Sequence, residues 1–351
     1  RRQWNPAAGS LAGARRAAPP WIGADETLLP LEAESELSLD ALRRFLLDPA
    51  GQFLRQRLDI RLPQIEDASE DIEPLQAPQR GLQRHALQRA AFDALLEGRD
   101  EATMRSSLRA RGVLPAGAMG TRALQAILRE VGPYAEAFKE WRRDAEATSL
   151  PVEAGIGGVR LHGRLADAWS QGKGFARLRF GAPNGSSSIR NGLDWLLAAA
   201  AGIETPFVEF HDDGDSGIGP HVRAPVSREA AIEALRQLLA LRQEGLQRPL
   251  PFAPHSAWAL FDADAPERGL QGAAKKWRGS ERGWAEGDGD AIRLALRGRD
   301  PFADAASAAE FARIAGIVFG AVTRGIAAPI ELGQIALPED DAEHADAGRA
   351  A

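Results

Sequence analysis

Apolar and polar side chains alternate along two stretches near the middle of the chain, at residues 159–169 and 175–180. This period of two predicts a pair of β-strands. The tetrapeptide Gln171–Gly174 between them predicts a tight turn, because its two glycines accept positive φ values. Residues 181–188 then predict a loop, and the helical period over 189–201 predicts a helix. The pattern therefore predicts a β-hairpin that leads into a helix.

Helical spacing of apolar residues dominates the rest of the chain. Residues 100–148 predict helices around a turn at 112–120, and two further strands are predicted at 207–210 and 256–261. The other predicted helices lie at 37–58, with a break at Pro49, and at 81–98, 227–244 and 305–324. The mixture of strands and helices predicts an α/β fold.

Three parts of the chain differ in how regular their pattern is. Residues 1–36 hold proline, glycine and scattered charges without a period, which predicts a linker or the end of a preceding domain. Residues 37–333 carry the periodic segments and predict one folded domain, within which the acidic, proline-bounded stretch 64–80 predicts an exposed loop. The tail, residues 334–351, is acidic and poor in apolar residues, and this predicts disorder.

Composition narrows the classes of function. The chain has 351 residues and a net charge of −6, so any contact with nucleic acid must be local. It has no cysteine, which excludes a disulfide, a thiol nucleophile and an iron–sulfur cluster. The sequence contains no run of about 18 apolar residues, so no membrane-spanning helix is predicted. The chain begins with Arg1 and carries no signal-peptide core, so we expect a fragment of a longer cytoplasmic protein.

A hairpin that leads into a helix is also the core of the PD-(D/E)XK nucleases, and this part of the chain resembles their RecB-type branch. In that branch the first strand reads G-x-x-D, the second D-x-K and the helix Q-x-x-x-Y. The resemblance implies a restriction-endonuclease-like core sheet flanked by many helices. When Gly163 is placed on the family glycine, Ala166 takes the position of the metal-binding aspartate. Arg177 and Arg179 then take the positions of the second carboxylate and the lysine.

These substitutions predict that the metal site is lost. A divalent metal ion needs oxygen ligands, usually carboxylates. An arginine repels it by about 4 kcal/mol per unit of ion charge at 4 Å and an effective dielectric of 20. Asp167 follows Ala166 but is expected on the opposite face of the strand. On the helix, Asn191 and Trp195 stand where the family has glutamine and tyrosine. We therefore expect no catalytic residue and no bound metal in this domain.

Other residues of metal-binding type have ordinary structural explanations. His85 stands in G-x-x-x-H, where some nucleases of this type bind metal, but a single histidine on a helix is usually structural. The loop HDDGDSGIGPH (211–221) is glycine-rich, which favours a surface turn over a rigid ligand set. Asp48 precedes Pro49 where related nucleases have a cluster-binding cysteine, so no iron–sulfur cluster is expected.

The segment 273–302 contains the one locally basic and aromatic patch of the sequence. Such a patch suits phosphate contact and base stacking. A helix that buries its tryptophans and leaves its basic side chains in water explains the pattern equally well. The residues that we consider for DNA binding are Lys275, Lys276, Trp277, Arg278 and Arg282. A second basic run, Arg105–Arg111, favours a solvated helix face.

The order and spacing of several segments are similar to the C-terminal region of the RecC family, the gamma subunits of exodeoxyribonuclease V (RecBCD). The similarity extends from about Leu37 to about Thr323. The segments are LSLDALRRFLLDPAGQFLRQRL, QRGLQRHALQRAAFDALLEG, RARGVLPAGAMG, RPLPFAPHSAWALFD and GDGD followed by RGRDPF. The resemblance implies a RecB-nuclease-like domain that has lost its catalytic residues and acts as a scaffold in double-strand-break repair by recombination.

The same resemblance implies the partners and leaves two other functions open. The expected partners are RecB-type and RecD-type subunits, double-stranded DNA ends and separated single strands, with no membrane. No cofactor is expected in this domain, because ATP and Mg²⁺ belong to the partner subunits. One alternative is an active nuclease that binds Mg²⁺ through Asp167, Glu209 or the acidic residues 211–215. The other is a docking domain that does not touch DNA.

Overall fold

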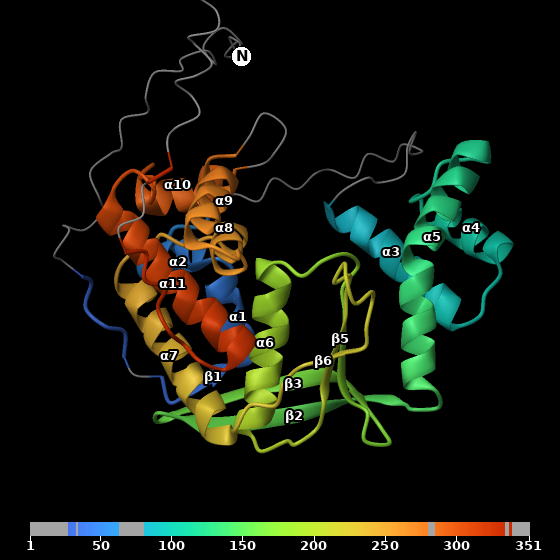
Figure 1. The fold of residues 1–351 in the computed structure, drawn as a ribbon, viewed down its shortest axis with the longest axis horizontal. Helices are drawn as coiled ribbons and strands as arrows, with labels where there is room; N and C mark the ends of the chain where they lie inside the picture. The colour runs from blue at the N-terminus through green and yellow to red at the C-terminus, as the bar shows by residue number, and fades with distance from the viewer. Residues whose placement is uncertain (1–26, 33, 63–80, 280–284, 334–336, 339–351) are drawn as a thin grey trace, which may run out of the picture. The chain divides into compact units, whose positions relative to one another are not determined.

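A computed structural model describes residues 27–32, 34–62, 81–279, 285–333 and 337–338 of the chain (Figure 1). These residues form eleven α-helices, a short 3-10 helix and a mixed sheet of six strands. The α/β class predicted from the sequence is thereby confirmed. The chain divides into two compact units. Unit 1 comprises Arg1–Leu62, Gly155–Leu161 and Ala230–Ala351, and unit 2 comprises Pro63–Ala154 and His162–Glu229.

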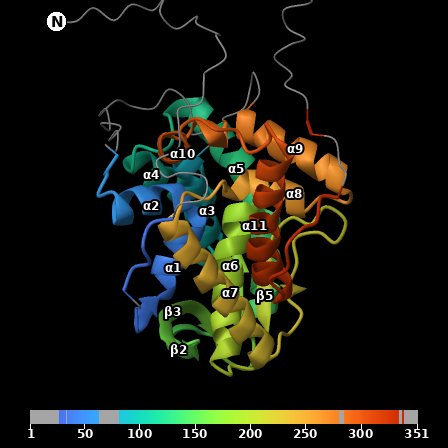
Figure 2. The ribbon, with the colours of Figure 1, turned by 90° about the vertical axis from the view of Figure 1, so that its left-hand side faces the viewer.

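Unit 1 is mainly helical. Its elements are β1 (Glu36–Ser38), α1 (Leu39–Leu47), α2 (Pro49–Arg57), nearly all of α7 (Arg228–Gln247), α8 (Pro254–Phe261), α9 (Pro266–Arg278), η2 (Glu286–Asp288), α10 (Asp290–Leu296) and α11 (Ala305–Arg324). Helix α9 packs on α8, and α8 packs on α11. Figure 2 shows α11, in red, beside α7.

Unit 2 combines strands and helices. Its elements are α3 (Gly81–Leu96), α4 (Glu101–Ala110), α5 (Gly117–Arg142), β4 (Gly174–Leu178), α6 (Gly185–Ala200), β5 (Phe207–Phe210) and β6 (His221–Val222). Strands β2 (Ala147–Ile156) and β3 (Val159–Trp169) belong to it except for the end of their hairpin. The strand order is β1-β3-β4-β5-β6, and β2 pairs with β3. Strands β4 and β5 are parallel, with α6 as their connection, and the β3–β4 and β5–β6 pairs are antiparallel.

An aromatic cluster covers one face of β4 and β5. Ala176 and Val208 pack there against Phe92 of α3 and Phe138 of α5. The Phe92 and Phe138 rings meet edge to face, with centroids 5.6 Å apart. Because side chains alternate along a strand, the residues next to Ala176 and Val208 point to the other face, toward α6. The face toward α6 therefore carries the buried rings of Phe175 and Phe207 together with the charged side chains of Arg177 and Glu209.

Several predicted elements match the structure, among them the strands at 159–169 and 207–210 and the helix at 305–324. The strand predicted at 256–261 is wrong, because these residues form helix α8 with Pro254 at its first turn. Proline suits that position since it lacks the N–H that a helix start leaves unbonded. The ring of Trp258 packs on α11, so tertiary contacts favour the helix.

Helix α6 begins four residues earlier than its apolar period predicts. Asn184 caps it: its side chain accepts a hydrogen bond from the Ser187 N–H, and the Ser187 hydroxyl accepts one from the Asn184 N–H. This reciprocal capping box satisfies two N–H groups that a helix start otherwise leaves without partners. The polar first turn explains why the apolar pattern alone missed it.

Helix α11 is long and apolar enough to cross a membrane by length and composition alone. In the structure, however, 61% of its most apolar window is buried. Ile314, Val318 and Phe319 on this helix are fully buried within unit 1. Its composition is that of a core helix.

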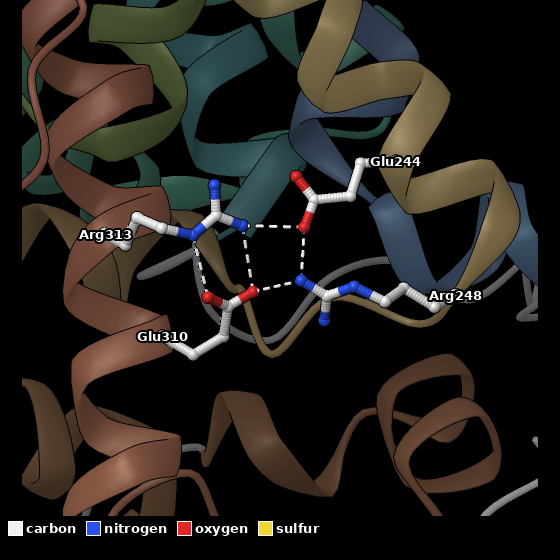
Figure 3. Close-up of polar contacts among 4 residues, drawn as sticks. All are labelled: Glu244, Arg248, Glu310 and Arg313. Carbon is white, nitrogen blue, oxygen red and sulfur yellow. Dashed lines mark hydrogen bonds and ion pairs between the residues drawn. The ribbon is translucent and has the colours of Figure 1, made fainter. Parts of the chain in front are cut away.

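Two arginines and two glutamates join α7 to α11 (Figure 3). Arg313 bonds both Glu310, at 2.7 Å from its Nε, and Glu244, at 2.7 Å from an Nη. Arg248 contacts the same two carboxylates. Partial burial raises the pKa of Glu310, but the hydrogen bonds from Arg313 and Arg248 outweigh it and lower this pKa to about 2. The network therefore stabilises the ionised glutamate in the folded state.

We expect the Glu310→Gln variant to lose about 1–3 kcal/mol of unfolding free energy at pH 7, because two partly buried guanidinium groups lose a shared carboxylate. A carboxyl group with a lowered folded-state pKa stabilises the fold above its unfolded pKa, near 4.5, and this contribution is lost as the pH falls toward about 2. The difference between wild type and variant should therefore shrink between about pH 5 and pH 2.

Urea denaturation at several pH values measures this difference. The control is Glu233→Gln, which removes an exposed carboxylate paired with Arg236 on the same helix, and it should leave stability within experimental error. Equal losses in both variants, or a Glu310→Gln loss that does not change with pH, would contradict the expectation.

Candidate functional site

The structure brings Ala166 and Arg177 together. Arg177 lies in β4, and its guanidinium donates a hydrogen bond of 3.0 Å to the backbone oxygen of Ala166 in β3. Asp167 has a φ of 53°, which breaks the regular alternation of β3, and both Ala166 and Asp167 are exposed. The expectation that Asp167 faces away by simple alternation therefore does not apply at this point of the strand.

Arg177 makes an ion pair with Asp194 of α6. One Nη lies 2.6 Å and the Nε 3.0 Å from the same carboxylate oxygen. Both side chains are only 12% exposed, so the contact is well shielded from water. The guanidinium also lies over the ring of Phe207, 5.2 Å from its centroid. A cation over an aromatic face adds an attraction of its own.

Glu209 of β5 is held by two other partners. Arg223 bonds both of its oxygens, with a shortest separation of 3.0 Å. Asn191 of α6 donates a hydrogen bond of 2.8 Å to one of them. The Arg223 guanidinium lies over Trp195, 5.0 Å from the ring centroid, and over Phe207 at 5.6 Å. The two positions considered on the predicted helix, Asn191 and Trp195, thus both contact this pair.

The result is a polar cluster in which each carboxylate has its own guanidinium partner. We call it the α6 cluster: Arg177, Asn191, Asp194, Trp195, Phe207, Glu209 and Arg223. A carboxylate that already accepts hydrogen bonds from arginine has few lone pairs left for a metal ion, and the cations beside it repel one. Within the described residues no group of three or more His, Asp or Glu side chains could hold a metal ion. Sequence reasoning missed Asp194 and Arg223, because their partners are distant in sequence.

Arg179, the third substituted position, lies outside this cluster. It follows β4, and its N–H donates to the Phe210 oxygen at 2.8 Å. Its guanidinium turns toward the loop before α6 and donates to the backbone oxygen of Ala182. Of the three substituted positions, Ala166 and Arg177 are in contact, whereas Arg179 lies apart from them.

The loop at 211–221 is held by contacts of its own residues. The rings of His211 and His221 stack with centroids 4.4 Å apart. His221 Nε2 lies 3.2 Å from the backbone oxygens of both His211 and Gly217. Burial lowers the pKa of His211, and His221 lowers it further, although the nearby Glu209 and Asp213 act in the opposite direction. The histidines thus serve the conformation of the loop.

The basic aromatic patch is only partly at the surface. Lys275 and Lys276 of α9 are exposed. Trp277 is buried and packs edge-on against Phe302 and Phe311, so the stacking role considered for it does not fit this geometry. Helical spacing turns its ring inward while the two lysines face water. Arg282, which we also considered, lies outside the described residues.

Arg278 of α9 pairs with Asp300 at 2.7 Å, so its charge is compensated. It borders a pocket of about 1020 Å³ in unit 1. Charged residues of both signs line this pocket: Arg278, Arg293, Arg297 and Arg299, and Asp288, Asp290 and Asp300. Arg293, Arg297 and Arg299 lie within the basic segment 273–302 but were not among the residues considered for DNA binding.

The fold and the α6 cluster define an α/β protein in which shielded ion pairs join β4 and β5 to neighbouring elements. Comparison with known protein families gives a match over most of the chain. Residues 34–265 match the family described as the RecC C-terminal domain. The chain belongs to this family, as the sequence resemblance predicted.

Two curated relatives carry the same name. The chain is 26% identical over 279 residues to RecBCD enzyme subunit RecC of Escherichia coli (strain K12), which covers 75% of this chain and 24% of that protein. It is 25% identical over 246 residues to RecBCD enzyme subunit RecC of Mycolicibacterium smegmatis (strain ATCC 700084 / mc(2)155), covering 68% and 22%. The matched region thus spans about a quarter of the length of these relatives.

We expect Arg177→Gln to destabilise the fold by about 2–3 kcal/mol, because it leaves the shielded Asp194 carboxylate without its cation. Asp194→Asn should destabilise the fold by a similar amount, because it leaves the Arg177 guanidinium without its carboxylate. The double variant should lose at least about 1 kcal/mol less than the sum, since neither charge is then left alone. Urea denaturation of the four proteins measures this coupling. Strictly additive losses would show that the pair contributes nothing as a pair.

Proposed function

We propose that this chain is the C-terminal part of a non-catalytic RecC-type subunit of a RecBCD helicase–nuclease. In this proposal it serves as a scaffold and guides DNA strands during double-strand-break repair by recombination. Its partners are RecB-type and RecD-type subunits, double-stranded DNA ends and the separated single strands. ATP and Mg²⁺ bind to the partner subunits. The assembly works in the cytoplasm.

The Arg177–Asp194 pair is the observation that best supports a non-catalytic role. In the register considered from the sequence, Arg177 occupies the position of a metal-binding carboxylate. The structure gives that arginine a shielded ion pair at 2.6 Å and a bond to Ala166, the residue at the other substituted ligand position. A stable contact of this kind explains how the domain keeps its fold after losing a metal site.

The arrangement in unit 2 also supports a PD-(D/E)XK-like origin. An antiparallel β3–β4 pair leads through α6 to β5, which lies parallel to β4. This is the hairpin-then-helix order that the resemblance implies. Our proposal is therefore that an ancestral nuclease core has become a structural module through substitution of its ligands.

We expect calorimetric titration with Mg²⁺ or Mn²⁺ to show no saturable heat, and a nicking assay to show no cleavage of DNA by this protein alone. The physical reason is that arginines satisfy the carboxylates of the α6 cluster. The control is Asp167→Ala, which removes the remaining exposed carboxylate near Ala166 and should change nothing. Metal-dependent cleavage that Asp167→Ala abolishes would overturn the proposal and favour an active nuclease.

Neutralising Lys275 and Lys276 distinguishes a role in guiding DNA strands from a role in subunit docking alone. If these lysines contact phosphates, the double Gln variant of the assembled complex should bind duplex DNA more weakly at low salt. The slope of log affinity against log salt should fall by about 0.9 for each lost contact. The matched control is Lys139→Gln, which neutralises an exposed lysine of α5. Unchanged affinity and slope in both variants would favour a docking domain without DNA contact at this patch.

A further inference from the structure

Arg179 is a partly buried cation without a carboxylate partner among the described residues. Its neighbours in sequence, Leu178 and Phe180, are apolar, and among the described residues its guanidinium donates only to the backbone oxygen of Ala182. Burial lowers its pKa; the Tyr134 phenol opposes this effect, and Arg190 adds to the lowering. An arginine side chain stays charged in a protein, so this burial is a cost that an anion would offset.

Other positive groups gather around Arg179. Burial lowers the pKa of His85, and then Arg179, Arg89 and Arg190 lower it further through their charges. Asp93 compensates the charge of Arg89 at 3.0 Å. His85 lies on α3, and the centroid of its ring is 6.0 Å from that of Phe180. The local potential is therefore positive on the side of unit 2 where α3, the end of β4 and the start of α6 converge.

The backbone adds to this potential. Arg179 donates to Ala182, which lies two residues before Asn184, the N-cap of α6. The N-terminus of a helix of 16 residues carries a partial positive charge. Gly181 of the same loop is held by two contacts: the Asp212 N–H donates to its oxygen, and the Tyr134 hydroxyl accepts from its N–H at 2.8 Å. We call the group His85, Arg179 and Arg190 the Arg179 patch.

Two features of the Arg179 patch match a nucleic-acid strand. First, Arg179 after β4 and Arg190 on α6 present two separated positive groups, as neighbouring phosphodiesters require. Second, His85 is exposed and lies beside Phe180, with tilted rings whose centroids are 6.0 Å apart, and its ring offers an aromatic surface on which an unpaired base can stack. The second feature favours a single strand, because the bases of a duplex are already stacked.

We propose that the Arg179 patch binds the phosphodiester backbone of single-stranded DNA. This inference rests on the proposed strand-guiding function and gives it a second contact surface, separate in sequence from Lys275 and Lys276. Arg179 contacts a phosphate oxygen, Arg190 contacts a neighbouring phosphate and His85 packs against a base.

The test compares Arg179→Gln and Arg179→Lys with wild type in the full-length protein assembled with its partner subunits. Fluorescence anisotropy with an oligo(dT) strand, at several salt concentrations, measures affinity and salt slope. Arg179→Gln should weaken binding about five- to tenfold at low salt and lower the slope by about 0.7, the value for one phosphate contact on a single strand. Arg179→Lys, which keeps the charge, should recover part of the affinity.

The matched control is Arg164→Gln, which neutralises an exposed arginine of β3 that bonds Ser149. It should change neither affinity nor slope. Circular dichroism and urea denaturation of each variant show whether the fold is kept. If Arg179→Gln unfolds the protein, the exposed Arg190→Gln variant tests the same surface with the same expected change in slope.

The outcomes separate the inference from the proposed function. Wild-type affinity and slope in Arg179→Gln and Arg190→Gln overturn the Arg179 patch, while strand guiding stands if the wild-type complex binds DNA. An equal loss with duplex DNA or inorganic phosphate as the probe overturns single-strand selectivity and leaves a general phosphate site. A wild-type complex that binds no DNA overturns the proposed function itself.

Discussion

Arg177 and Glu209 are direct neighbours in register across the parallel strands β4 and β5, yet each takes its ion-pair partner from elsewhere. Arg177 pairs with Asp194 of α6, and Glu209 pairs with Arg223, which follows β6. Each pair ties a strand to a neighbouring element. Partly buried charges are tolerated only when they are compensated. The charged residues on the α6 side of β4 and β5 therefore depend on α6 and the segment after β6 being in place.

The same principle operates in unit 1 with a different geometry. There Arg248 and Arg313 share the carboxylates of Glu244 and Glu310, so that four charges form one network between α7 and α11. Exposed pairs such as Glu233 with Arg236 have similar separations but are screened by water. The two kinds of pair differ in burial and in reach: Glu233 and Arg236 lie one turn apart on α7, whereas the network joins residues of two helices.

This distribution of compensated charge bears on the function that we propose. In the α6 cluster, arginines satisfy the carboxylates, which suits a structural role. At the end of β4, Arg179 lacks a carboxylate among the described residues and lies near His85 and Arg190. The fold thus places a compensated site on β4, at Arg177, and an electropositive one just after it, at Arg179. We regard the first as relevant to stability and the second as relevant to binding.

The sequence alone determined the family, the α/β class and most elements, because these follow from local periods and from the order of segments. It also drew attention to Ala166 and Arg177, since a change of residue type at a motif position is visible in one dimension; the structure places the two in contact, and a lost metal site there stays a prediction. Helix α8 was predicted as a strand because a short apolar run suits either structure, and packing against α11 decides between them. Only the tertiary structure showed that Trp277 is buried and that Arg179 is separate from Arg177. The partners Asp194 and Arg223 could not be predicted, because ion pairs between distant residues depend on how the chain folds back on itself.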